Sequence, residues 1–140
     1  MKIKNPTTHI QSGKRRGALT VEVALCLPIL FTILFGSFEL AWANMVLHAT
    51  ESAAYEGARV GIIPGANQQK IETAAGEVLR ALGINNFTVS VTPGTIDEST
   101  ENVEVNVRVP FQRNISFPTA FFTDPTFEGN CLLSREIIRN

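Results

Sequence analysis

The sequence has 140 residues and a net charge of −1, and hydrophobic residues make up 44% of it. This length has room for a membrane helix and one small domain, and it excludes several large domains. The small net charge hides an asymmetry, because residues 1–17 hold five lysines and arginines and no acid. The remaining residues hold 7 basic and 13 acidic side chains, so 7 − 13 = −6.

A basic leader peptide is predicted over residues 1–17, and it ends in the cluster Lys14, Arg15 and Arg16. Because an uncharged apolar segment follows directly, we interpret this arm as the cytoplasmic flank of a membrane span. The same position argues against a nucleic-acid-binding tail. We therefore expect the lipid bilayer, and no nucleic acid, among the partners.

A transmembrane helix with a periplasmic extension is predicted over residues 18–63. The stretch from Val23 to Phe38 has 16 residues without a charge. A span needs about 20 apolar residues, which carries it to about Trp42, where an indole ring suits the far interface. The predicted protein is therefore a single-pass protein of the inner membrane, with its N-terminus in the cytoplasm.

Two acids, Glu22 and Glu39, flank this span. Glu22 lies five residues past Gly17, and an acid at the edge of a span is costly and usually functional. The basic cluster, Gly17 and Glu22 together resemble the processing site of type IV pilin-like proteins. This resemblance implies that a membrane-embedded prepilin peptidase cuts between Gly17 and Ala18, and that Glu22 then assists assembly.

The role of Glu22 also has a physical basis. Cleavage would leave a new ammonium on Ala18, and Glu22 of a neighbouring subunit can pair with it. In a filament core of low dielectric, such a pair favours one register over others. The alternative is that Glu22 only complements the positive end of the helix macrodipole.

A longer pattern resembles the TadE-like family over about residues 14–60. It comprises Gly17–Leu25, Leu27-Pro28, Phe35-Gly36, Phe38-Glu39, Ala53-Ala54 and Glu56–Arg59. The resemblance implies a pseudopilin of the Tad apparatus, which builds Flp-type pili for tight adherence. Its implied partners are the prepilin peptidase, other pilins or pseudopilins, and Tad inner-membrane assembly proteins.

The sequence also departs from the main fibre subunits of that system. Major Flp pilins are shorter and usually have a tyrosine after the glutamate, whereas Val23 follows Glu22 here. A further domain also follows the helix. These departures favour a minor or assembly component, and they leave the choice between TadE and the related TadF proteins open.

A small α+β periplasmic domain is predicted over residues 66–140. An apolar stripe with helical spacing follows Asn67, which can cap the helix, and ends before Gly83. Alternating valines predict strands over 87–92 and 103–109, and a last strand is predicted over 131–138. We therefore expect one further helix and an antiparallel sheet of about three strands.

A loop is predicted over residues 111–129, and it contains five phenylalanines and two prolines. These aromatic side chains need cover. One hypothesis is that they pack on the sheet or on the second helix, and the other is that they form a docking surface for a partner.

The sequence offers no pattern typical of catalysis. It lacks a phosphate-binding glycine loop, a metal-ligand cluster and a placed nucleophile with its base. Cys26 and Cys131 do not make a disulfide framework. We therefore expect no enzyme activity, no metal and no cofactor, and regard the chain as the substrate of an enzyme.

Two other functions stay open. The sequence Ala41-Trp42-Ala43 could serve signal peptidase I, which would release a secreted soluble domain beginning at Asn44. A third possibility is an uncleaved single-span scaffold. The mature N-terminus distinguishes the three, because it would be Ala18, Asn44 or Met1.

Overall fold

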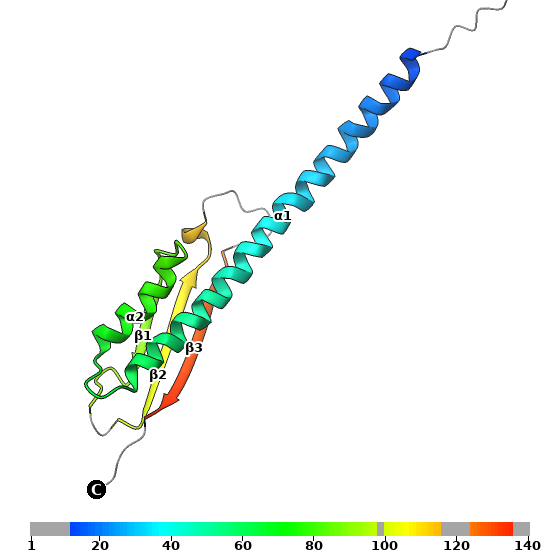
Figure 1. Cartoon of the computed structure of the whole chain (residues 1–140). Helices are drawn as coiled ribbons and strands as arrows, with labels where there is room; N and C mark the ends of the chain where they lie inside the picture. Colours follow the sequence, from blue (N-terminus) through cyan, green and yellow to red (C-terminus); the bar gives the residue numbers. More distant parts are fainter. Residues whose placement is uncertain (1–11, 98–99, 116–123, 136–140) are drawn as a thin grey trace, which may run out of the picture. The chain divides into compact units, whose positions relative to one another are not determined.

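The computed structural model describes residues 12–97, 100–115 and 124–135, and for residues 12–16 it describes the backbone only. Its elements are α1 (Ser12–Gly61), α2 (Gln68–Ala81), β1 (Thr88–Thr92), β2 (Asn102–Pro110), the short 3-10 helix η1 (Gln112–Asn114) and β3 (Thr126–Ser134). The strands form one antiparallel sheet in the order β1-β2-β3 (Figure 1). This architecture confirms the predicted α+β fold with a long apolar helix, one further helix and three strands.

The chain divides into two compact units, residues 1–37 and residues 38–140, and α1 contributes to both. In the second unit one face of α1 is buried and consists mostly of small residues. They are Ala43, Val46, Ala49, Thr50, Ala53, Ala54, Gly57, Ala58 and Gly61. Their spacing of three and four residues places them on one side of a helix, which lets α1 lie close to the sheet.

α2 begins and ends as its sequence predicts. The Asn67 side chain accepts a hydrogen bond from the Lys70 backbone N–H at 2.9 Å, which satisfies one free donor of the first turn. Gly83 follows the helix with φ +78°, a left-handed conformation that glycine adopts without steric cost. Ile71, Ala75 and Leu79 form the buried stripe of α2.

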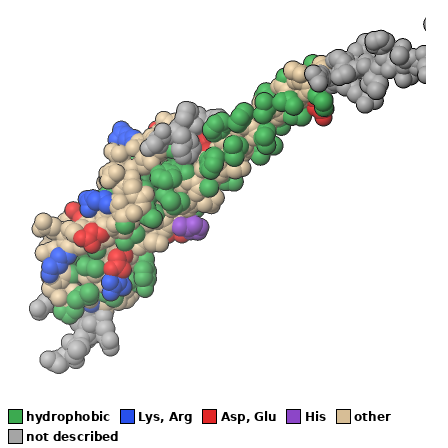
Figure 2. All heavy atoms as spheres, turned by 45° about the horizontal axis from the view of Figure 1, so that its top comes forward, with side chains coloured by type: hydrophobic (Ala, Val, Ile, Leu, Met, Phe, Trp, Pro, Cys, Tyr) green, Lys and Arg blue, Asp and Glu red, His purple; other side chains and the backbone are tan. Residues whose placement is uncertain are grey.

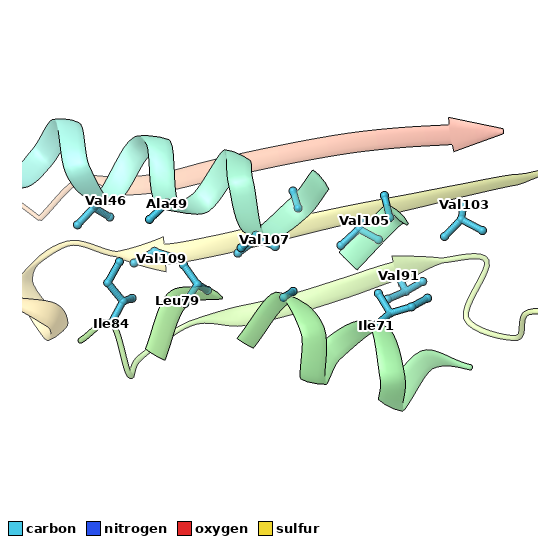
Figure 3. Close-up of a cluster of buried hydrophobic side chains, with 14 residues drawn as sticks. Val46, Ala49, Ile71, Leu79, Ile84, Val91, Val103, Val105, Val107 and Val109 are labelled. Carbon is cyan, nitrogen blue, oxygen red and sulfur yellow. The ribbon is translucent and has the colours of Figure 1, made fainter. Parts of the chain in front are cut away.

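The core of the second unit lies between the two helices and one face of the sheet. The four alternating valines of β2, from Val103 to Val109, are all fully buried. Figure 3 shows them pointing towards Val46 and Ala49 of α1 and towards Ile71 and Leu79 of α2. Because a strand turns alternate side chains to opposite faces, the other face of β2 carries polar residues.

That other face is linked by polar contacts across the strands. Arg108 Nε lies 3.0 Å from a carboxylate oxygen of Glu128, and both side chains are exposed. Asn130 donates to Glu104 at 2.8 Å. Exposed pairs of this kind contribute little to stability, but they suit a sheet face that is open to solvent.

The last strand begins earlier than the sequence indicated. β3 spans Thr126–Ser134, so the predicted start at residue 131 and the loop assignment of 126–129 are wrong. Residues 136–138 of the predicted strand lie outside the described part of the chain. Gly129 belongs to this strand and pairs with Val107 of β2. A Cβ at Gly129 would lie 2.5 Å from the Thr50 carbonyl oxygen.

Two of the five loop phenylalanines belong to the core. Phe111 is fully buried, and Phe127 packs against its ring edge-to-face, with centroids 5.7 Å apart. For these two residues the packing hypothesis is confirmed. Phe117, Phe121 and Phe122 lie outside the described residues, so the docking hypothesis stays a prediction for them.

Glu39 and Trp42, which the sequence predicts at the far side of the bilayer, both belong to the second unit. Glu39 is only 2% exposed, and Trp42 is partly buried against the hydrophobic core. α1 therefore begins to pack against the domain at about Glu39. This position is fewer than 20 residues after Val23, where the uncharged apolar run starts.

Asn114 is a buried polar residue that ties three segments together. Its side-chain oxygen accepts from the backbone N–H groups of Asn85 and Asn86, at 3.0 and 2.9 Å. Its amide nitrogen donates to the carbonyls of Asn86 and Pro110, at 2.7 and 2.9 Å. One side chain thereby joins the segment before β1 to the end of β2.

We predict that Asn114→Ala lowers the free energy of unfolding by about 3 kcal/mol, because it leaves several backbone groups without partners. Asn130→Ala is the control, because its side chain is exposed, and its change should stay within about 0.5 kcal/mol. The measurement is denaturant unfolding of the full chain in detergent. Equal stability of the two variants would contradict the proposed tie.

Candidate processing site

The predicted processing residues all lie in the first turns of α1. The backbone of Lys14, Arg15 and Arg16 is helical, and their side chains lie outside the described set. Gly17 and Ala18 follow in the same helix, and both are exposed. The structure therefore places the basic cluster and the proposed cut on one continuous helical segment.

Glu22 is exposed and lies one helical turn after Ala18. Four residues correspond to about 6 Å along a helix axis, so the two residues share one face. The Glu22 carboxylate and an ammonium on Ala18 would therefore place opposite charges on the same face of the helix. Such an arrangement can pair within one chain or between neighbouring chains.

The segment that follows has the surface of a membrane span. Large apolar side chains are exposed along it, and Figure 2 shows hydrophobic side chains over the visible side of this helix. They are Leu19, Val21, Val23, Leu25, Leu27, Ile29, Leu30, Phe31, Ile33, Leu34 and Phe35. This helix is long and apolar enough to cross a membrane, which is consistent with a membrane-anchored protein.

Two hydroxyl groups within the segment are satisfied by the helix itself. Thr32 donates to the Pro28 carbonyl at 2.8 Å, and Ser37 donates to the Ile33 carbonyl at 2.8 Å. A hydroxyl without a partner would be costly in hydrocarbon, and these bonds remove that cost. The segment is therefore compatible with lipid despite its polar side chains.

The second half of α1 has a structural task. Ala53, Ala54 and Ala58 are fully buried, and a Cβ on Gly57 would lie 3.2 Å from Val105 Cγ1 and 3.3 Å from Ile71 Cγ2. A larger side chain at residue 57 would therefore separate the helix from the sheet.

The exposed side of this part of α1 carries an ion pair. Arg59 donates to both carboxylate oxygens of Glu56, at 2.8 and 2.5 Å. These hydrogen bonds lower the pKa of Glu56 and raise the pKa of Arg59. The pair is one turn apart and solvent-accessible, so it supports the helix only weakly.

A groove lies between the second half of α1 and α2. It is lined by Glu51, Ser52, Tyr55, Glu56, Ala74, Glu77 and Val78. Within the described ranges, no group of three histidine, cysteine or acidic residues could hold a metal ion.

Comparison with known proteins bears on the α1 segment. Residues 17–59 match the family model described as TadE-like protein, which confirms the resemblance drawn from the sequence. The match is consistent with a protein of the Tad system. Comparisons with curated proteins and with solved structures gave no match.

We predict that Gly57→Val lowers the free energy of unfolding by about 1–3 kcal/mol, because the added methyl groups would overpack the contact with Val105 and Ile71. Ser52→Val is the matched control, because it adds a similar side chain to the exposed side of the same helix. Unfolding of both full-length variants in detergent measures the difference. A neutral Gly57→Val would show that the contact tolerates side chains.

Proposed function

We propose, from the match of residues 17–59 to the TadE-like family, that this chain is a pseudopilin of Tad pilus assembly. A prepilin peptidase cuts the chain between Gly17 and Ala18, and the mature protein acts in building Flp-type pili for tight adherence. The chain is then a substrate and an assembly component, not an enzyme. The choice between TadE and TadF stays open.

The observation that carries this proposal is the arrangement at the start of the match. The matched segment begins at Gly17, directly after the basic cluster, and Glu22 follows on the face of Ala18. An exposed apolar helix continues from there. A cut after Gly17 would remove the five leader cations and leave a short, charged N-terminus on an apolar helix.

The proposal includes a location and partners. The basic leader lies in the cytoplasm, the apolar segment crosses the inner membrane, and the domain from about residue 44 lies in the periplasm. The partners are the prepilin peptidase, other pilins or pseudopilins and Tad inner-membrane assembly proteins. Nucleic acid is not among the expected partners.

The packing of α1 argues against release by signal peptidase I after Ala43. Ala43 is 5% exposed, Val46 is fully buried, and Trp42 packs against the same core. A cut there would remove Glu39 and Trp42 from the folded domain. The helix on both sides of Ala43 therefore belongs to one packed unit, which favours an anchored protein over a released one.

We predict that Gly17→Phe abolishes processing and leaves a precursor that is 17 residues longer than the mature protein. Phenylalanine would place a large side chain directly at the cut. Mass spectrometry of the membrane-extracted protein gives the N-terminus, and Gly94→Phe, which alters an open position of the domain, is the control. Normal maturation of Gly17→Phe would rule out this cut.

We predict that a periplasmic reporter fused to the C-terminus is active and that a cytoplasmic reporter fused at the same place is inactive. The five basic residues ahead of the span set this orientation. Paired fusions to a periplasmic and a cytoplasmic reporter give the measurement. Activity of the cytoplasmic reporter alone would reverse the proposed topology.

We predict that Glu22→Ala leaves cleavage largely intact and impairs pilus assembly, because the carboxylate acts after the cut on the ammonium of Ala18. In the assembled filament, loss of the Glu22 carboxylate would leave the buried ammonium of Ala18 unpaired, which costs on the order of 3–5 kcal/mol. Glu22→Asp is the matched control that keeps the charge. Processing is scored by gel shift and surface pili by microscopy in the same cells.

Two results would change this assignment. Normal piliation in Glu22→Ala cells would remove the assembly role of the carboxylate. Loss of cleavage together with loss of pili would make Glu22 a residue that the peptidase recognises.

A further inference from the structure

Arg80 stacks on an aromatic ring in a groove between α2 and β1. Its guanidinium carbon lies 5.2 Å from the centroid of the Phe87 ring, which is a cation–π distance. Gly76 leaves the space for this contact, because an added Cβ would lie 2.9 Å from Arg80 Nη1 and 3.1 Å from Phe87 Cζ. A glycine inside a helix lowers the helix population about fivefold relative to alanine. α2 thus carries a glycine where the stacked guanidinium needs room.

The N–H donors of this guanidinium are not used within the described part of the chain, where no carboxylate forms an ion pair with Arg80. Glu72 lines the same groove, but its carboxylate accepts from the Gln68 amide at 2.7 Å. Arg80 lies in the last turn of α2, where the helix macrodipole favours a cation, but that effect requires neither the ring nor Gly76. A planar guanidinium held by one face offers its edge to a carboxylate in a fixed orientation.

An acidic groove on the other side of α2 has the chemistry that this guanidinium binds. It is the groove between α1 and α2, where Glu51 and Glu77 supply carboxylates and Tyr55, which is 55% exposed, supplies an aromatic ring. Glu56 also lines this groove and is engaged in the ion pair described above. Carboxylates beside an aromatic ring suit a guanidinium, which forms charge-assisted hydrogen bonds at its edge and stacks through its face.

Both surfaces belong to this chain, and they lie on different sides of α2. Residues of α2 and β1 line the Arg80 groove, and residues of α1 and α2 line the acidic groove. After residue 17 the chain holds 7 basic and 13 acidic side chains, so a second copy offers many carboxylates and few competing cations. A contact between two different surfaces is heterologous, so each added copy leaves one of each surface open for the next.

We propose that Arg80 of one copy binds in the acidic groove of a second copy of this chain. There the guanidinium pairs with Glu51 and Glu77 and meets the ring of Tyr55. The contact goes beyond the proposed function, because it involves residues of the domain and does not depend on removal of the leader.

The first test changes the charge at residue 80 in the full chain in detergent. Arg80→Glu should raise the dissociation constant for self-association on the order of tenfold, because like charges then meet in the groove. Arg113→Glu is the matched control, since it makes the same change of charge at an exposed residue outside both grooves. Sedimentation over a range of protein concentrations measures both constants.

A mixture of two variants tests whether the two surfaces bind each other. Glu51→Gln together with Glu77→Gln removes the charges of the acidic groove and keeps Arg80, whereas Arg80→Glu keeps the groove. Each variant alone should associate more weakly than the wild type. The equimolar mixture should form pairs and no larger assemblies, because only one matched set of surfaces remains in each pair.

A second measurement identifies the contact by cross-linking. Arg80→Lys keeps the positive charge and provides an amine that a zero-length carbodiimide joins to a carboxylate in direct contact. The full-length variant is mixed as copies with ordinary and with heavy nitrogen, so that mass spectrometry distinguishes links between copies from links within one. Position 80 of one copy should be joined to Glu51 or Glu77 of another.

Equal self-association of Arg80→Glu and Arg113→Glu would overturn the contact, as would a wild-type chain that stays monomeric. If the apolar part of α1 holds the copies together in every variant, the cross-link decides, and its absence between copies at position 80 overturns the contact. These results leave cleavage after Gly17 and the proposed function in place. A chain that is never cut after Gly17 contradicts the proposed function and leaves this contact standing.

Discussion

α1 has two parts with different exposure, and the packing of its second part organises the domain. From Leu19 to Phe35 the helix exposes large apolar side chains, as a lipid environment requires. From Ala43 to Gly61 it buries a narrow face of small residues and turns polar groups such as Glu51 outward. The first part of α1 is thus a candidate membrane anchor, and its second part packs against the hydrophobic core of the domain.

Small residues make that second role possible. Gly57 of α1 lies so close to β2 that an added Cβ would be 3.2 Å from Val105, and Gly129 of β3 approaches the Thr50 backbone of α1. Close approach of the backbones lets the fully buried valines of β2 reach both helices, so one face of the three-stranded sheet is covered by a hydrophobic core. Asn114 then fixes the segment before β1 against the end of β2 through four hydrogen bonds.

The proposed chemistry is confined to the first turns of α1, away from any arrangement typical of an active site. Gly17, Ala18 and Glu22 are exposed on one helix, which suits a segment that another protein must grip and cut.

Local features could be predicted from the order of residues, because they depend on neighbours in the chain. Apolar composition indicated a candidate membrane span, Asn67 and Gly83 marked the ends of α2, and alternating valines indicated β2. Contacts in the folded domain were needed to show that Glu39 is buried, that Asn114 joins distant segments, and that β3 starts at Thr126. These features arise from contacts between residues far apart in sequence, where propensity and periodicity carry no information.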